Sequence, residues 1–181
     1  LPGKNIKPLN GVPLIGWSIK VAKQVERISR VIVSTDSEEI AKIALEYGAE
    51  VPFMRPNELA QDDSPEWLVW KHALDYLNNH NNGIDGLVVV PTTAPLRSKD
   101  DVNNCINEFE KGNVDVVITV SNAHRSPYFN MVKTNQNGFS SLVISSKEKI
   151  TRRQDVPEVF DMTTVAYVAK PGFVLQNHGI F

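Results

Sequence analysis

Residues 86–98 read GLVVVPTTAPLRS, a sequence that predicts, in order, a strand, a loop and the start of a helix. The apolar run 86–90 predicts a buried strand, because it has no polar face to turn toward water. The loop 91–97 follows, and Ser98 is a typical helix cap. Helical spacing would then turn four side chains inward: Val102, Cys105, Ile106 and Phe109.

The same strand–helix unit recurs along the chain. The β-branched run Arg30–Thr35 precedes a helix capped by Ser37, and Ser64-Pro65 is a strong helix start. Strand and helix alternate four times, which predicts a single α/β domain over residues 1–181, with a mostly parallel sheet and helices on both faces. Further strands are expected at residues 50–54, 115–120 and 163–169.

The pattern changes near residue 125. Two extended runs, 128–133 and 139–144, flank Asn137-Gly138, the best short-range hairpin signal in the chain. We therefore expect a small antiparallel excursion over residues 125–160, inserted into the parallel arrangement.

Composition argues against several classes of protein. A net charge of −2 and a pI near 6.1 do not suit a duplex-binding protein, and runs such as 87–90 are too short to span a bilayer. One cysteine permits no disulfide within the chain, which suits a reducing, cytoplasmic compartment. Cys105, Trp67 and Trp70 are expected to pack in the core, and the histidines lack the spacing of zinc ligands.

Both ends of the chain look interrupted. Leu1-Pro2-Gly3 has the composition of the middle of a loop, and Gly179-Ile180-Phe181 shows no capping or tail pattern. We expect residues before Leu1 and after Phe181.

Strand ends are where an open α/β sheet binds its ligands. Ser34-Thr35-Asp36 and Pro91-Thr92-Thr93 each end a predicted strand, and Gly3-Lys4-Asn5 precedes a helix. Glycine lets the backbone approach an anion and lysine adds charge, so this opening turn is a candidate phosphate site. Taken alone, the tripeptide favours an ordinary surface turn. Asp36 is expected either to orient its loop or to cap a turn.

The ordered set of motifs resembles the acylneuraminate (CMP-sialic acid) cytidylyltransferases over nearly the whole chain. The stretch 1–19, LPGKNIKPLNGVPLIGWSI, is similar to the second half of that family's nucleotide-binding signature. The resemblance implies a Rossmann-like fold of the nucleotide-diphospho-sugar transferase type, with residues 125–160 serving dimerisation. The other landmarks in family order are VIVSTD (31–36), RP (55–56), ELA (58–60), DS (63–64), PTTAPLR (91–97) and RRQD (152–155).

Carried over residue by residue, the resemblance implies a CTP site. Lys4 and Asn5 would contact the phosphates and the ribose, with Lys4 also taking part in catalysis. The cytosine and ribose pocket would be formed by Ser64, Pro91, Thr92 and Thr93. A plain turn is the alternative for the Pro-Thr loop, and Ser64 would combine binding with helix capping.

The resemblance also implies two cations on the sugar side, Arg55 and Arg153, the latter also catalytic. A sialic-type substrate carries a carboxylate, which a planar guanidinium binds in bidentate fashion. For Arg152 and Arg153 the alternative is a solvated basic face shared with Lys147 and Lys149.

The chain departs from the family in three places. Val90 stands where the family has a ligand-contacting glutamine, so sugar or base contacts are expected to differ there. Residues 161–166, DMTTVA, replace an Asn-Gly-Ala pattern and predict a variant sugar pocket. The family's metal ligands lie in a C-terminal Asp-x-Asp segment, so we expect the Mg²⁺ ligands beyond Phe181 and none in this fragment.

The implied reaction transfers CMP from CTP to the anomeric hydroxyl of a nine-carbon 2-keto sugar acid and releases pyrophosphate, with Mg²⁺ bridging phosphate oxygens. A homodimer is expected, with neither nucleic acid nor membrane as a partner. One alternative is a Kdo or other sugar nucleotidyltransferase, although RRQD favours the sialic branch. The other is a non-catalytic nucleotide-sugar-binding domain. Residues 1–181 alone are expected to be inactive.

Overall fold

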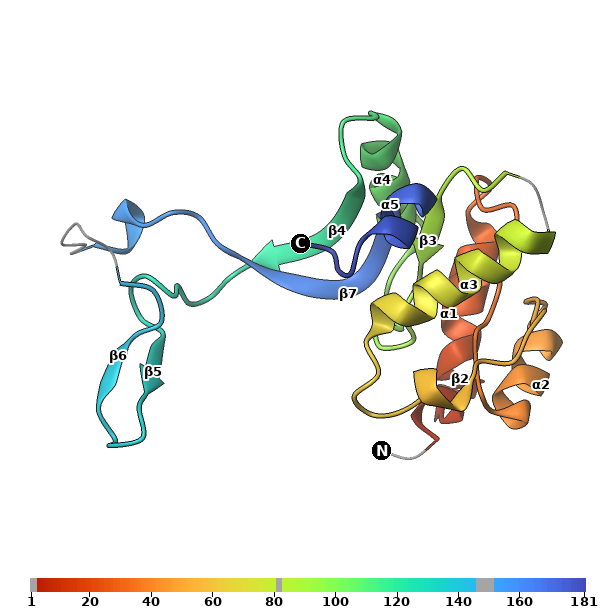
Figure 1. Cartoon of the computed structure of the whole chain (residues 1–181), viewed down its shortest axis with the longest axis horizontal. Coiled ribbons are helices and arrows are strands. Elements are labelled where there is room, and N and C mark those ends of the chain that lie inside the picture. Colours follow the sequence, from red (N-terminus) through yellow and green to blue (C-terminus); the bar gives the residue numbers. More distant parts are fainter. Residues whose placement is uncertain (1–2, 81–82, 146–151) are drawn as a thin grey trace. The chain divides into compact units, whose positions relative to one another are not determined.

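The computed structural model describes residues 3–80, 83–145 and 152–181 (Figure 1). The chain forms two compact units, a first unit of Leu1–Thr119 with Thr164–Phe181 and a second unit of Val120–Thr163. The helices are α1 (Leu14–Gln24), α2 (Glu38–Glu46), α3 (Glu66–His80), α4 (Lys99–Glu110) and α5 (Pro171–Gln176), with the short 3-10 turns η1 (Lys4–Ile6), η2 (Asn57–Leu59) and η3 (Arg153–Asp155). The strands are β1 (Pro8–Leu9), β2 (Val12–Pro13), β3 (Leu87–Val89), β4 (Val116–Asn122), β5 (Val132–Thr134), β6 (Ser140–Leu142) and β7 (Phe160–Ala169).

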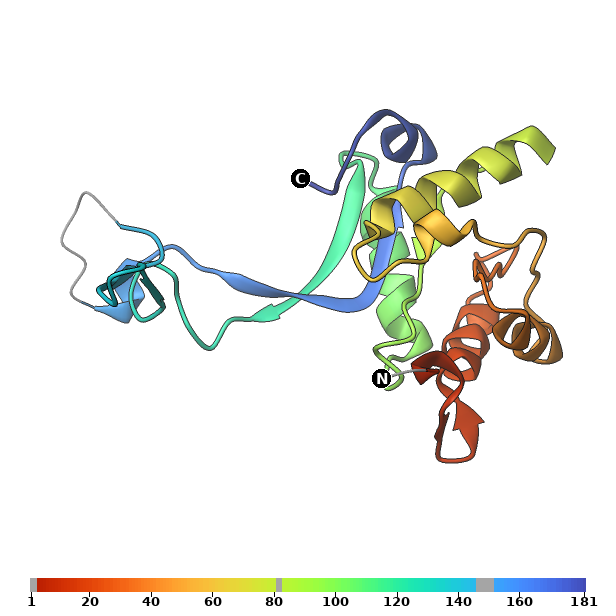
Figure 2. The same ribbon diagram turned by 60° about the horizontal axis from the view of Figure 1, so that its bottom comes forward.

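The helix starts follow the capping signals in the sequence. The Ser37 hydroxyl accepts a hydrogen bond from the Ile40 N–H at 3.3 Å, which fixes the start of α2. At α4, Ser98 and Asp101 form a reciprocal capping box, in which each side chain accepts from the other's backbone N–H. The short hairpin of β1 and β2 leads directly into α1 (Figure 2).

Strand pairing corrects the predicted, mostly parallel sheet. The three-stranded sheet has the order β3–β7–β4, and β7 runs antiparallel to β3 with Val88 opposite Val168. Parallel pairing is recorded at an isolated bridge between Ile32 and Glu50. The fold is therefore α/β, but its sheets are small and the antiparallel pairs dominate them.

The difference arises at Arg30–Thr35, the segment that was predicted to be a strand. Its backbone forms hydrogen bonds to Glu50 along one edge. The Val33 N–H donates to the Glu50 carbonyl at 2.9 Å, and the Glu50 N–H donates to the Val31 carbonyl at 2.7 Å. The backbone groups of Ile32 consequently point away from Glu50. Ile32 lines a cavity that it shares with β3, and no ladder forms across that space within the described residues.

The core of the first unit comprises three apolar clusters around these elements. One packs α1 and α4 against β7, and Cys105 lies in it, as predicted. A second contains Trp67, Trp70 and Leu74 of α3 with β7 and α5, so both tryptophans are core residues. The third joins α1 to α2 and the segment after residue 30.

The second unit contains the predicted hairpin. β5 and β6 pair antiparallel with Val132 opposite Leu142, and Gly138 takes the positive φ of 81° that the turn requires. The strands are shorter than the predicted runs 128–133 and 139–144. A role in dimerisation stays a prediction. Among the described helices, none combines the length and apolarity needed to cross a membrane.

Candidate active site

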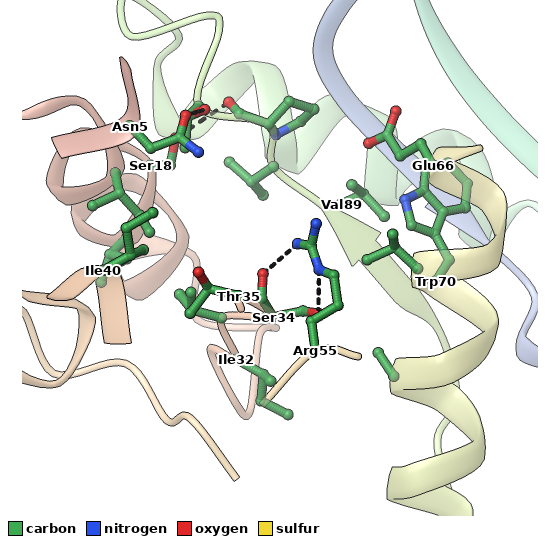
Figure 3. Close-up of a pocket in the computed structure, with 18 of the residues that line it drawn as sticks. Asn5, Ser18, Ile32, Ser34, Thr35, Ile40, Arg55, Glu66, Trp70 and Val89 are labelled. Carbon is green, nitrogen blue, oxygen red and sulfur yellow. Dashed lines mark hydrogen bonds between the residues drawn. The ribbon is translucent and has the colours of Figure 1, made fainter. Parts of the chain in front are cut away.

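A cavity of about 640 Å³ in the first unit gathers most of the residues singled out from the sequence (Figure 3). Its walls come from α1, the segment after residue 30, the start of α3, β3 and the loop that follows β3. These elements lie far apart in the sequence, so only the fold brings them together. Seven predicted site residues line the cavity: Asn5, Arg55, Ser64, Val90, Pro91, Thr92 and Thr93.

The opening turn and the Pro-Thr loop are joined directly. The Thr92 hydroxyl donates to the Asn5 side-chain oxygen at 2.8 Å, across 87 residues of sequence. Because the Asn5 oxygen is occupied in this way, its amide N–H groups are available to the cavity. Gly3 adopts a φ of 64°, which favours glycine and turns the chain into η1. Lys4 is exposed and does not line the cavity.

Hydrogen bonds from polar side chains of other segments fix the Pro-Thr loop. The Ser18 hydroxyl of α1 donates to the Pro91 carbonyl at 3.2 Å. The hydroxyls of Thr93 and Thr164 lie 2.9 Å apart. Arg97, at the end of the loop, is buried and donates to the Ser18 hydroxyl and the Pro91 carbonyl. The loop is thus a fixed wall of the cavity.

Arg55 turns its guanidinium into the cavity beside Ser34 (Figure 3). Its Nε donates to the Ser34 hydroxyl at 3.2 Å, and its Nη2 donates to the Ser34 carbonyl. Burial lowers the pKa of Arg55, while the charges of Asp36 and Glu66 act in the opposite direction. Neither carboxylate forms an ion pair with it among the described residues. Arg55 therefore offers a cation to a ligand.

Ser64 lines the cavity but does not cap α3. Its hydroxyl donates to the Glu58 carbonyl at 2.9 Å and accepts from the Gln61 N–H at 3.1 Å. These bonds close the loop ahead of the helix, so the predicted capping role is wrong. Val90 contributes a half-buried apolar side chain, which cannot make the hydrogen bonds of a glutamine. Asp36 also lines the cavity, and Ser37 is the residue that caps α2.

Arg153 belongs to η3 of the second unit, and its side chain lies outside the described part of the chain. Lys147 and Lys149 lie outside the described residues altogether. The neighbouring Arg152 is exposed, and its Nε pairs with the Asp155 carboxylate at 2.9 Å. The described part of this segment thus contains a surface ion pair, of the kind that contributes little to stability.

A metal site built by the protein alone needs several acidic, histidine or cysteine side chains close together. Within residues 3–80, 83–145 and 152–181, no three or more His, Cys, Asp or Glu side chains gather closely enough to hold an ion. The described residues thus contain no dedicated cage for an ion, whereas Mg²⁺ at nucleotide sites commonly binds one or two carboxylates together with substrate phosphates.

Sequence reasoning missed the roles of Ser18, Arg97 and Thr164. Each acts through contacts that span 67 to 79 residues, which no local pattern reveals. Arg97 does carry one signal: it is a charged residue between an apolar loop and a helix cap. Thr164 lies within the DMTTVA segment, where the chain departs from the family pattern.

A family model described as "Cytidylyltransferase" matches residues 1–176. The chain belongs to the cytidylyltransferase family. The resemblance drawn from the motifs is thereby confirmed.

Three relatives share the chain almost from end to end. "Post-translational flagellin modification protein B" of Campylobacter coli is 38% identical, over 98% of this chain and 75% of its own length. "CMP-N,N'-diacetyllegionaminic acid synthase" of Campylobacter jejuni is 35% identical over the same shares. "Pseudaminic acid cytidylyltransferase" of Campylobacter jejuni is 28% identical, over all of this chain and 77% of its own.

Two solved structures support the fold. A CMP:2-keto-3-deoxy-manno-octonic acid synthetase complexed with CTP superposes with a TM-score of 0.67 at 18% identity, covering 98% of this chain and 70% of its own. A 4-diphosphocytidyl-2C-methyl-D-erythritol synthase from Anaerococcus prevotii gives 0.67 at 12% identity, covering 96% and 68%. At these identities the likeness concerns the fold alone.

Proposed function

We propose that this cytidylyltransferase transfers CMP from CTP to the anomeric hydroxyl of a nine-carbon 2-keto sugar acid and releases pyrophosphate. The observation that carries the proposal is the convergence of Asn5, Arg55, Ser64 and the Pro91–Thr93 loop on one cavity. The names of the relatives direct the choice of sugar. The more similar of the two relatives whose names state a sugar is a diacetyllegionaminic acid synthase, so we propose a sugar of that type.

The nucleotide would lie against the Pro-Thr loop. A wall fixed by buried hydrogen bonds suits the reading of a base edge, since its groups do not have to be ordered on binding. The amide of Asn5, oriented by Thr92, would donate to the ribose or the phosphates. Lys4, exposed on the same turn, would neutralise phosphate charge as the leaving pyrophosphate forms.

The sugar carboxylate would be bound by Arg55. A role of Arg153 in sugar binding stays a prediction from the family resemblance. Arg55→Gln is then expected to raise the KM of the sugar acid by roughly 10- to 150-fold, because a charge-assisted hydrogen bond contributes about 1.5–3 kcal/mol. Steady-state kinetics with each substrate varied in turn measures this. A rise confined to the KM of CTP would contradict the proposal and assign Arg55 to the nucleotide.

Mg²⁺ is proposed to accompany CTP and to supply charge neutralisation at the phosphates. In keeping with the family resemblance, we propose that its protein ligands lie after Phe181. On that basis residues 1–181 alone are expected to show no turnover.

A homodimer in the cytoplasm is proposed as the working form. The second unit has no buried apolar side chain among its described residues, while several of its aromatic and aliphatic side chains are exposed. A second copy of the chain is the proposed cover for them.

The test is pyrophosphate release by the full-length gene product, given CTP, Mg²⁺ and a panel of sugar acids that includes legionaminic, pseudaminic, neuraminic and Kdo types. Turnover with a nine-carbon acid and CTP, and not with ATP, GTP or UTP, is expected. Turnover with Kdo alone would move the protein to another branch of the family. Binding of CTP without turnover on any sugar would contradict the proposed reaction.

A further inference from the structure

Arg97 is a buried cation without an acidic partner. Its side chain is 6% exposed. Among the described residues, its hydrogen bonds go to one hydroxyl and two backbone carbonyls, and no carboxylate pairs with it. The carboxylate of Asp101 acts on it through charge alone, because that group is engaged in the capping box of α4.

The three partners of the guanidinium belong to three elements. Nη1 donates to the Ser18 hydroxyl of α1 at 2.8 Å. Nη2 donates to the Pro91 carbonyl of the Pro-Thr loop and to the Thr164 carbonyl of β7, the latter at 3.2 Å. One side chain therefore fixes the loop against a helix and a strand.

These contacts reach both ends of the Pro91–Thr93 segment. The Pro91 carbonyl accepts from Arg97 and from Ser18 at the same time. Thr164 is held by its carbonyl, and its hydroxyl lies 2.9 Å from that of Thr93. Arg97 itself does not line the cavity, so it acts through the residues that do.

Burying the charge of Arg97 carries a desolvation cost. Burial lowers the pKa of Arg97 to about 10, so the group remains charged at neutral pH while losing hydration. Its Nε is also buried without a partner. The hydrogen bonds to Ser18, Pro91 and Thr164 offset part of that cost. An apolar side chain could not make them, so the arginine fixes the loop in a geometry that packing alone would not impose.

We propose that Arg97 is a positioning residue for nucleotide binding, which fixes the Pro91 carbonyl and the Thr93 hydroxyl in the orientation that CTP requires. The inference rests on the proposed function of the same cavity. It assigns to Arg97 an effect on CTP that a residue needed only for folding would not have.

The experiment compares Arg97→Met and Arg97→Lys in the full-length gene product. Titration calorimetry gives the Kd of CTP, and kinetics give the KM of each substrate. Arg97→Met is expected to weaken CTP binding by about 10-fold, the cost of one or two lost hydrogen bonds, with the KM of the sugar within about twofold of its original value. Arg97→Lys keeps the charge and one or two donors, so it is expected to recover part of the loss.

Arg27→Met is the matched control. Arg27 also connects separate segments, through the Asn103 carbonyl and the side chains of Asn107 and Glu110, but it does not line the cavity. It is expected to lower the melting temperature while leaving the Kd of CTP unchanged. If Arg97→Met does not fold, Thr164→Val removes the hydroxyl beside Thr93 and is expected to raise the KM of CTP about threefold.

Two outcomes would overturn the inference while leaving the proposed function in place. One is an Arg97→Met protein that binds CTP as tightly as the original; the other is an equal rise in both KM values. An original protein that binds no CTP would instead remove the proposed function, and this inference with it.

Discussion

The Pro91–Arg97 loop and the second unit differ in which kind of side chain they bury and which they expose. The loop is built around buried polar groups, with Ser18 and Arg97 satisfying the Pro91 carbonyl from behind. The second unit instead exposes apolar side chains, with Phe139 at 73% and Val132 at 63% exposure. A loop fixed from within its own unit can be a preformed binding wall. Apolar side chains left exposed within their own unit mark a candidate interface with another molecule.

The largest expected effect tests whether stability resides in the first unit. Leu74 is fully buried in α3 between the tryptophans and β7, so Leu74→Ala is expected to cost about 2–5 kcal/mol of unfolding free energy. Val132→Ala, at an exposed site of β5, is expected to change it by less than about 0.5 kcal/mol. Urea denaturation measures both. Similar losses at the two sites would show that the hairpin shares the stability of the core.

Much of the difference between the packed first unit and the hairpin of the second could be predicted from the sequence, because it depends on local patterns. Caps at Ser37 and Ser98, the Asn137-Gly138 turn and the inward position of Cys105 depend on near neighbours and were predicted correctly. The prediction of a strand at residues 50–54 was wrong, because pairing depends on which segments lie alongside, and there only Glu50 forms a bridge.

The candidate site likewise contains residues that local patterns predict and residues that they do not. The Pro-Thr loop was recognisable from its motif, and the structure places it on the cavity beside Asn5. The bracing by Arg97 and Thr164 could not be foreseen, because the two residues lie 67 positions apart and meet only in the folded chain. A buried arginine also contradicts the usual expectation that arginine stays at the surface.

The next largest effect is expected on dimer affinity, from the exposed apolar side chains of the second unit. Phe139→Ser in the second unit is expected to weaken a homodimer by about 2 kcal/mol, or roughly 30-fold in its dissociation constant, since large aromatic side chains dominate such interfaces. Sedimentation equilibrium measures the dissociation constant. Lys133→Ser, in the same hairpin, is the control and is expected to have little effect. A dimer of unchanged affinity would place the interface elsewhere.

A smaller effect is expected at the end of the Pro-Thr loop. Ser98→Ala removes the hydroxyl that accepts from the Asp101 N–H in the capping box. The change is expected to cost about 1 kcal/mol of unfolding free energy. Because Ser98 adjoins Arg97, the Kd of CTP is measured alongside, and it is expected to stay within about twofold. A large loss of CTP affinity would show that the loop depends on the cap as well as on Arg97.

The smallest effect is a pH dependence inside the core of the first unit. Burial raises the pKa of the Cys105 thiol above its ordinary value, with a further contribution from the charge of Asp101. A group whose folded pKa is raised contributes stability that is fully present below the unfolded pKa and is lost as the pH rises toward the folded pKa. Stability should therefore fall because of this thiol as the pH rises above its unfolded pKa of about 8.5.

Cys105→Ala tests that contribution. The variant is expected to be less stable at pH 7, because it leaves space beside Val102 and Ile106. It is expected to lose less further stability than the original as the pH rises above about 8.5. Thermal unfolding at matched pH values measures the difference. A second readout is the rate of reaction with a disulfide reagent, which should be slow until the chain unfolds, since the thiolate is the reactive form. A fast reaction of the folded protein would show that the α4 side of the core opens readily, and that the first unit is less rigid than its buried loop implies.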